Sequence, residues 1–362
     1  MTDEEEKKVD LLARLQSAAE LEMTTIPAYL TALLSIKRPG NRGVAENIRS
    51  VMTEEMLHLA LVSNVMSSIG GKLRVTDIHV PSYPFKLTFK GKGFVDRQFD
   101  VHLAAFSEEA IKTFMAVERP RAPKSLTSDF GRTGTTVPEY TIGEFYDRII
   151  TLLDELHTSL GSKRLFVGNP SIQIGEDYYW SAGGKPVIVS DIATAKSAMQ
   201  TVIQQGEGTS DPLNDGDSPQ IRKPFEVAHY YRFREIFCKK RYASTDIPTD
   251  DPTGEPLEVD YTSVYPIKTD AKSTDYEKGS PLSEMNNTFN RQYSQMLIQL
   301  EEGLNGNPKI LYTAIMNGMH GLSELGIRMM ATPIPGDKHG LHGCPTFEWL
   351  DAQRPTQITR AL

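Results

Sequence analysis

Two Glu-x-x-His pairs are the part of this sequence best suited to chemistry: Glu55 with His58, and Glu226 with His229. When such a pair lies in a helix, residues three apart share one face, so its carboxylate and imidazole can reach the same metal ion. Bundles that hold two iron or manganese ions take a Glu-x-x-His pair from each of two helices and a single Glu from each of two others. The two pairs therefore predict a di-metal site, provided that two further helices each supply a buried glutamate.

The first pair lies within the apolar stripe of a predicted helix. Val51 precedes Glu55 by four residues, and Val62 follows His58 by four, so all of these positions fall on the core-facing side. A carboxylate in such a stripe is costly unless it is paired or bound to a metal. Glu55 and His58 are therefore predicted to be metal ligands.

The preceding helix, predicted over residues 8–37, carries one glutamate in a comparable stripe. Glu22 occupies that stripe, whereas Glu20 projects from another face and is expected to be a solvated surface carboxylate. Tyr29 lies further along the stripe and is expected to pack in the core, with a hydrogen bond to the site as the alternative. Glu22 is thus the first of the two single glutamates.

The glutamate of the third helix is less well determined by pattern. Glu144 flanks the apolar stripe of a helix predicted over residues 141–160 but does not occupy it. Glu109 and Glu118, near a shorter helix predicted over residues 107–117, remain alternatives.

The second pair is placed in a helix that opens near Pro219. There Glu226 and His229 share a face with Phe233. The alternative interpretation is that His229 is a histidine of the core and that Glu226 is a glutamate of the surface.

Composition is that of an ordinary soluble protein. The 362 residues are 39% hydrophobic and 24% charged, and the net charge of −8 with no basic cluster argues against a nucleic-acid partner. No apolar run reaches membrane-spanning length, and the acidic start MTDEEEKK is unlike a signal peptide. We therefore expect a cytoplasmic protein without a membrane partner. Its two cysteines, Cys238 and Cys344, are expected to be free thiols.

Long helical segments alternate with irregular inserts, which predicts a mainly α fold. Residues 72–104 form a long crossover after the second helix, and further helices are predicted over about 281–303 and 308–330. We divide the chain into residues 1–245, a di-metal bundle with inserts, and residues 246–362, a linker and a C-terminal helical extension that packs on the bundle.

Five segments carry a resemblance to a known family: LEMTTIPAYLTALLSI (21–36), EEMLHLALVSNVMSSIGG (54–71), TIGEFYDRI (141–149), QGEG (205–208) and AHYYRFREI (228–236). They resemble the ferritin-like domain related to iminophenyl-pyruvate dimer synthases, enzymes of the violacein and rebeccamycin type of pathway. The likeness continues into VYPIKTD, FNRQYSQML and GLHGCPTFEWL, so it spans nearly the whole chain.

The resemblance implies a ferritin-like four-helix bundle and a set of metal ligands, namely Glu22, Glu55, His58, Glu144 and His229. It leaves two candidates for the last carboxylate. The spacing to His229 favours Glu226, whereas the recurrence of QGEG in the family retains Glu207.

A set of carboxylates and imidazoles suits iron or manganese better than soft, thiophilic metals. We therefore expect two iron ions, with manganese as the alternative, in a non-haem di-iron oxidase or oxygenase. Its expected partners are a small, amino-acid-derived substrate of specialised metabolism and dioxygen or peroxide; a homo-oligomer is compatible with the sequence. The alternative is a ferroxidase or metal-binding protein without an organic substrate. The long inserts and the C-terminal extension favour the enzyme, because they can wall a substrate pocket.

Overall fold

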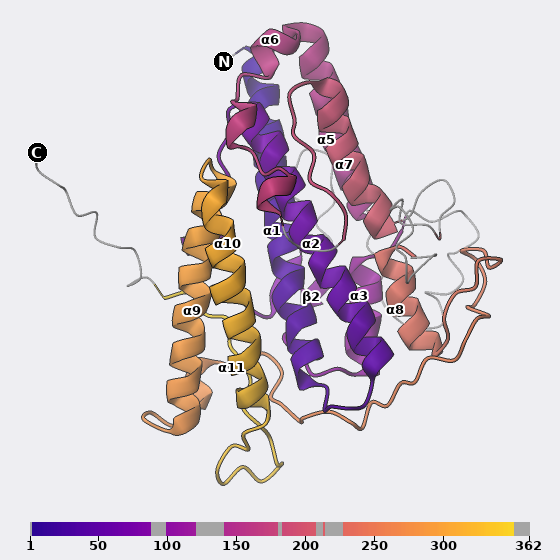
Figure 1. Ribbon diagram of the computed structural model, residues 1–362, viewed down its shortest axis with the longest axis vertical. Helices are drawn as coiled ribbons and strands as arrows, with labels where there is room; N and C mark the ends of the chain where they lie inside the picture. Colours follow the sequence, from indigo (N-terminus) through magenta and orange to yellow (C-terminus); the bar gives the residue numbers. More distant parts are fainter. Residues whose placement is uncertain are drawn as a thin grey trace, which may run out of the picture.

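The computed structural model describes residues 2–87, 99–120, 141–179, 183–207, 213 and 227–350. Within these residues the chain is mainly helical, which confirms the predicted class, and two long antiparallel helices, α1 and α2, form its centre (Figure 1). The longer helices are α1 (Asp3–Ser35), α2 (Arg42–Ser68), α3 (Glu108–Val117), α5 (Ile142–Leu160), α7 (Ile192–Glu207), α8 (His229–Cys238), α9 (Pro281–Leu304) and α11 (His320–Met330). The short helical turns are η1 (Asp77–His79), α6 (Ser162–Leu165), η2 (Pro170–Ile172), η3 (Glu176–Tyr178), η4 (Ser273–Asp275), η5 (Pro308–Ile310), α10 (Leu311–Thr313) and the π-helical η6 (Ala314–Met319).

Local sequence signals account for the ends of the two central helices. Thr2 and Glu5 form a capping box at the start of α1, and the acidic first turn is favourable beside the positive end of the helix dipole. Helix α2 stops where Gly70 adopts a φ of 80°, which a residue with a side chain rarely takes. Most of the apolar stripe of each helix is buried, including Leu15 of α1 and Val51 of α2.

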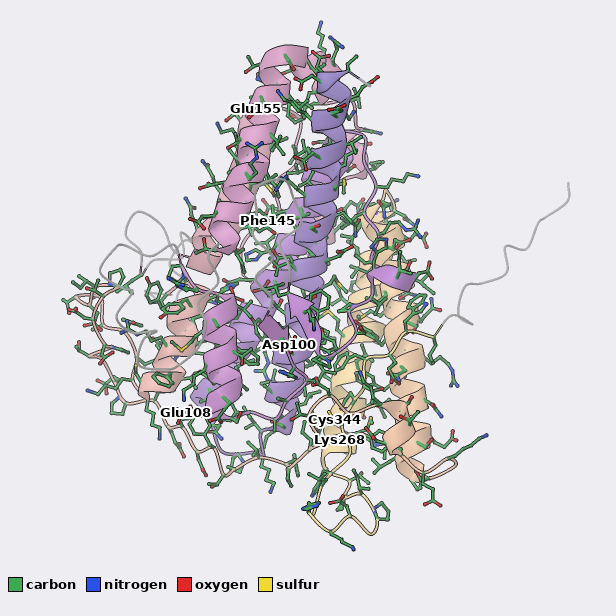
Figure 2. The ribbon with its side chains drawn as sticks, turned by 180° about the vertical axis from the view of Figure 1, so that it is seen from behind. Asp100, Glu108, Phe145, Glu155, Lys268 and Cys344 are labelled. Atoms are coloured by element: carbon green, nitrogen blue, oxygen red, sulfur yellow. The ribbon has the colours of Figure 1, made fainter. Side chains whose placement is uncertain are left out.

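Two shorter helix pairs cover one side of the central pair. Helices α5 and α7 pack on each other and against α1 and α2, and α3 packs on α8 further along α2. Figure 1 shows the α5–α7 pair above the α3–α8 pair. Lys7 near the start of α1 pairs with Glu155 of α5 at 3.3 Å, and Figure 2 shows Glu155 near this upper end. The start of α5, the end of α7, the end of α3 and the start of α8 therefore come together halfway along α1 and α2.

The crossover predicted over residues 72–104 contains a two-stranded antiparallel sheet. Strands β1 (Phe85–Leu87) and β2 (Phe99–Val101) pair with Phe85 opposite Val101. The crossover is fixed to the bundle by Tyr83, whose hydroxyl donates to the backbone oxygen of Thr24 at 2.7 Å.

Helices α9 to α11 form a layer on the other side of α1 and α2 (Figure 1). The segment after α8 reaches them along the bundle, where the backbone N–H of Tyr265 donates to Ser35 at the end of α1 at 2.8 Å. After α11 the chain turns back, and the Tyr276 hydroxyl donates to the backbone oxygen of Cys344 at 2.6 Å. Both cysteines are free thiols, as expected.

Candidate metal centre

Three glutamates and two histidines meet where the helix ends come together. They form two overlapping groups, Glu22–Glu55–His58 and Glu55–Glu118–His229, and within each group the candidate ligand atoms lie within 4.8 Å of one another. All five side chains are buried, with exposed fractions of 3% or less. Buried carboxylates and imidazoles at this spacing are a donor set for metal ions.

Glu55 belongs to both groups. Its Oε2 lies 3.6 Å from Nδ1 of His58, and its Oε1 lies 3.1 Å from Nδ1 of His229. Each carboxylate oxygen therefore faces a different histidine, which is the arrangement of a carboxylate that can bridge two ions.

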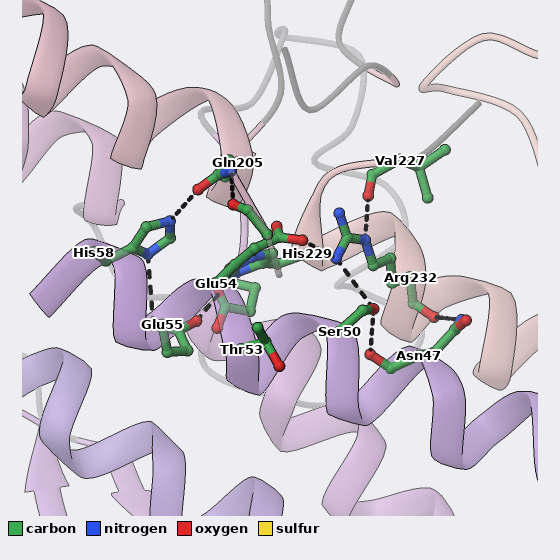
Figure 3. Close-up of polar contacts among 12 residues, drawn as sticks. Asn47, Ser50, Thr53, Glu54, Glu55, His58, Gln205, Val227, His229 and Arg232 are labelled. Atoms are coloured by element: carbon green, nitrogen blue, oxygen red, sulfur yellow. Dashed lines mark hydrogen bonds and ion pairs between the residues drawn. The ribbon is translucent and has the colours of Figure 1, made fainter. Parts of the chain in front are cut away.

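Hydrogen bonds to the far side of each imidazole indicate which nitrogen is available to a metal. Nε2 of His58 lies 2.9 Å from the Gln205 side-chain oxygen, and Nε2 of His229 lies 3.0 Å from Oε2 of Glu54 (Figure 3). Because an oxygen acceptor requires Nε2 to carry the proton, the Nδ1 lone pair of the neutral ring faces the cluster. Both histidines are thus oriented as metal ligands usually are.

Nδ1 of His229 is the atom that best tests whether this arrangement fits a metal ion. It is buried, and it makes no hydrogen bond within the described part of the chain, although carboxylate oxygens of Glu55 and Glu118 lie 3.1 and 3.4 Å away. A buried polar atom without a partner is costly. A cation bound between this nitrogen and the two carboxylates would satisfy it.

The charges of the metal-free cluster are poorly balanced. Burial, and then the negative charges of Glu118 and Glu22, raise the pKa of Glu55 well above its usual value. Burial opposes the charge of His229 as well, but Glu118, Glu54 and Glu55 together raise the pKa of this ring well above its usual value. Both shifts favour the protonated forms, so a bound cation would compete with protons for these side chains.

Two tyrosines hold the outer oxygens of the terminal carboxylates. The Tyr146 hydroxyl donates to Oε1 of Glu22, and the Tyr29 hydroxyl donates to Oε1 of Glu118. Both tyrosines are fully buried. Each bond orients its carboxylate so that the other oxygen faces the cluster, and Tyr29 thus combines the expected core packing with the alternative, a hydrogen bond to the site.

A buried ion pair supports the His229 side. Nη1 of Arg232 donates to Oε1 of Glu54 at 2.6 Å, and Nε of Arg232 donates to the Val227 backbone oxygen at 2.6 Å (Figure 3). Burial raises the pKa of Glu54, but the Arg232 charge and the His229 N–H outweigh it and bring this pKa down to about 2. The sequence pattern does not select Glu54, because its position beside Glu55 is the only signal that the sequence offers and its pairing with Arg232 is a tertiary contact.

Glu144 is not among the residues that the structure brings to the cluster. It is the third residue of α5, where its Oε2 accepts from the Thr141 backbone N–H at 3.0 Å and its own N–H donates to Thr141 Oγ1 at 3.2 Å. Its type and position are those of a capping box, which satisfies backbone donors at a helix start. The third-helix carboxylate of the cluster is instead Glu118, at the end of α3, one of the two alternatives that the apolar pattern left open.

The second Glu-x-x-His pair differs from its prediction. Helix α8 begins at His229, and Ala228 before it is extended, with a ψ of 163°. The helical spacing assumed for Glu226 and His229 therefore does not apply, and Glu226 itself lies outside the described residues, as does the side chain of Glu207. Helix α7 does approach the cluster, because a Cβ on Gly206 would lie 3.9 Å from Oε2 of Glu118.

Comparisons with known proteins agree with this architecture. A family model described as Ferritin-like matches residues 15–238. Dichlorochromopyrrolate synthase from Lentzea aerocolonigenes is 23% identical over 98% of the chain, although the chain spans only about 37% of the length of that protein.

A solved structure supports the fold independently. The crystal structure of a ferritin-like protein from Caulobacter vibrioides matches with a TM-score of 0.56 at 22% identity, over 88% of this chain and 93% of the other. In the described part of the chain, no helix is both long and apolar enough to cross a membrane. The family match covers well over half of the chain, and the resemblance inferred from the sequence segments is confirmed: the chain belongs to the ferritin-like family.

Proposed function

We propose that this protein is a non-haem di-iron oxidase or oxygenase that acts on a small, amino-acid-derived substrate. The observation that carries the proposal is the convergence of two imidazole Nδ1 atoms on three buried carboxylates, with Glu55 shared between the two groups. A histidine that binds a metal usually donates its other ring N–H to an oxygen atom, and the Nε2 atoms of both His58 and His229 do so here. A purely structural ion pair has no need of that arrangement.

The donor set fits iron. Oxygen and imidazole ligands without a thiolate suit iron and manganese, and the unsatisfied Nδ1 of His229 is the position that an ion would fill. Glu22, Glu55 and His58 would hold one ion, and Glu55, Glu118 and His229 would hold the other. Two iron ions bound here would supply the redox capacity to reduce dioxygen or peroxide while a substrate is oxidised.

Glu207 and Glu226 remain the candidates for a further carboxylate on the His229 side. The described donors number three carboxylates and two imidazoles, one carboxylate fewer than the usual set of four with two histidines. Glu207 follows Gly206, which faces Glu118, and Glu226 stands three residues before His229. Metal content of the Glu207→Ala and Glu226→Ala variants would decide between them.

The remaining residues of the site would position the ligands and exclude water. Tyr29 and Tyr146 hold the terminal carboxylates, Gln205 and Glu54 hold the imidazoles, and all four side chains are buried. A dry, rigid surrounding strengthens every electrostatic interaction at the site. These residues therefore act through the ligands that they orient.

The proposed substrate class comes from the relative. Its name describes a synthase, and its match over 98% of this chain supports a biosynthetic reaction on a small molecule here. The alternative is a ferroxidase that consumes oxygen with ferrous iron alone.

The experiment begins with anaerobic loading of the purified protein with ferrous iron and measurement of the bound metal. We expect about two irons per chain, and fewer than one would refute the di-iron site. Oxygen uptake is then compared with and without candidate amino-acid-derived substrates. Substrate-dependent uptake supports the oxidase or oxygenase, whereas uptake that stops when ferrous iron is exhausted, whatever substrate is added, supports the ferroxidase.

A further inference from the structure

A second compartment lies on the other side of the central helices. Helices α9 to α11 pack on α1 and α2 from the side opposite to α5 and α7 (Figure 1), and they enclose an apolar pocket of about 100 Å³. Ile26 and Leu30 of α1, and Met52 and Met56 of α2, form part of its inner wall. The π-helical turn η6 forms part of the outer wall, and such turns occur often at functional sites.

The pocket and the metal centre use different faces of the same two helices. Met23 and Met56 line the pocket, and each directly follows a candidate ligand, Glu22 and Glu55. Neighbouring residues of an α-helix point about 100° apart, because one turn takes about 3.6 residues. None of the five residues of the cluster lines the pocket, so a ligand in the pocket would need no metal in order to bind.

One polar group in this pocket lacks a partner. The side chain of Tyr293 lines the pocket and is 2% exposed, and its hydroxyl makes no hydrogen bond within the part of the chain that the structure describes. Its ring is held edge-on against Phe347, with centroids 5.3 Å apart. A buried hydroxyl without a partner destabilises a protein, so its presence in a pocket points to a partner that binds there.

The lining restricts the chemistry of that partner. None of the described residues around the pocket carries a formal charge, and a buried ion without a counter-charge is strongly disfavoured. Five of the lining residues are methionines, whose sulfur atoms make favourable contacts with aromatic rings. The volume is of the order of the cavity of about 150 Å³ that is known to bind benzene.

We propose that this pocket binds a neutral molecule with one aromatic ring and one hydrogen-bonding group, which pairs with the Tyr293 hydroxyl. Phenol satisfies each requirement and is the natural probe. Toluene matches its size but lacks the hydrogen bond, and benzoate adds a negative charge.

The five lining methionines provide the readout. Protein labelled with ¹³C at the methionine methyl groups is titrated with phenol, in metal-free and in metal-loaded form. We expect saturable shifts of pocket methyls such as Met52 and Met296, with Met66 and Met199, which do not line the pocket, unchanged. Both forms should respond alike, so failure of the metal-centre proposal would leave this result intact.

Variants identify the role of the hydroxyl. Tyr293→Phe should weaken phenol binding about fivefold, as expected for loss of one hydrogen bond, and leave toluene binding unchanged. Tyr261→Phe is the matched control, because the Tyr261 hydroxyl is likewise buried and without a hydrogen-bond partner among the described residues, but Tyr261 does not line the pocket. Tyr261→Phe should change neither the affinity for phenol nor the affinity for toluene.

Three results would overturn the proposal. The first is the absence of saturable shifts at the pocket methyls. The second is benzoate binding as tightly as phenol, because the uncharged lining should reject it. The third is equal phenol affinity in the wild type and in Tyr293→Phe.

Discussion

Replacement of Glu55 by glutamine tests the candidate centre at the residue that both groups share. The change keeps the size of the side chain and removes its charge. Burial together with the charges of Glu118 and Glu22 raises the pKa of Glu55 well above its usual value, which shifts this side chain toward its neutral form. Glutamine resembles that neutral form. The metal-free Glu55→Gln variant should therefore unfold within about 1 kcal/mol of the wild type.

Metal binding should separate the two proteins. A ligand present at about 100 times its Kd adds about 2.7 kcal/mol per site to the free energy of unfolding. For a chain longer than about 250 residues, 1 kcal/mol raises Tm by roughly 2 °C, so we expect about 5 °C per filled site. The variant loses the carboxylate whose two oxygens lie 3.1 and 3.6 Å from the two histidine nitrogens, and its shift should fall below about 2 °C.

The assay is anaerobic thermal unfolding with and without ferrous iron, combined with metal analysis of the desalted protein. Glu20→Gln is the matched control, because Glu20 lies on α1 close to Glu22 in sequence but its carboxylate pairs with His79 at 2.7 Å, away from the cluster. The Glu20→Gln variant should keep the full rise in Tm on addition of ferrous iron. A Glu55→Gln variant that retains two metals and the wild-type shift would refute the assignment.

Four further outcomes are expected from the structure. Glu118→Ala should lower the bound metal from about two ions to about one per chain, whereas Glu144→Ala should retain both metals and lose about 1 kcal/mol of stability with its capping box, as metal analysis and urea unfolding would show. Glu54→Ala should weaken metal affinity roughly 10- to 100-fold by freeing an imidazole that Glu54 orients, measured by competition with a chelator. The raised pKa of His229 stabilises the metal-free protein fully below the ordinary histidine pKa of about 6.5, and this stabilisation is lost as pH rises through the raised value. Metal affinity should therefore increase over that range, with proton release detectable by calorimetry in two buffers. Tyr293→Phe should raise the free energy of unfolding of the ligand-free protein by about 1 kcal/mol, and a clear loss of stability would contradict the unpartnered hydroxyl.

The central helices and the first half of the site can be predicted from sequence pattern, because Glu22, Glu55 and His58 each stand in a long apolar stripe. The predicted start of the first helix, residue 8, is wrong by five residues, because α1 begins at Asp3, directly after the Thr2 cap. The stripe itself shows which face of each helix is buried, and therefore that these three side chains point into the core. Packing of α1 on α2 is then enough to bring them together.

The other half depends on helix ends, which periodicity does not place. Glu118 caps the end of α3, and His229 opens α8 directly after an extended residue, so neither lies within a helix long enough to show its face. Glu144 has the right residue type in a matching segment, but its position three residues after Thr141 makes it a helix cap. Which of these ends meet is decided by the crossover and by the packing of α3 on α8, both of which are tertiary features.

This placement also suggests why the centre would matter to the fold as well as to the chemistry. The residues around the cluster come from the end of α3, the start of α8, the first turns of α5 and the last turn of α7, and helix ends fray more readily than helix centres. Two of the five candidate ligands, Glu118 and His229, come from these ends, and with metal ions bound they would tie α3 and α8 to α1 and α2. Helices α5 and α7 would be held less directly, through the hydrogen bonds of Tyr146 to Glu22 and of Gln205 to His58. Metal binding and ordering of this junction should therefore be one event, while the apolar pocket on the far side of α1 and α2 stays as it is.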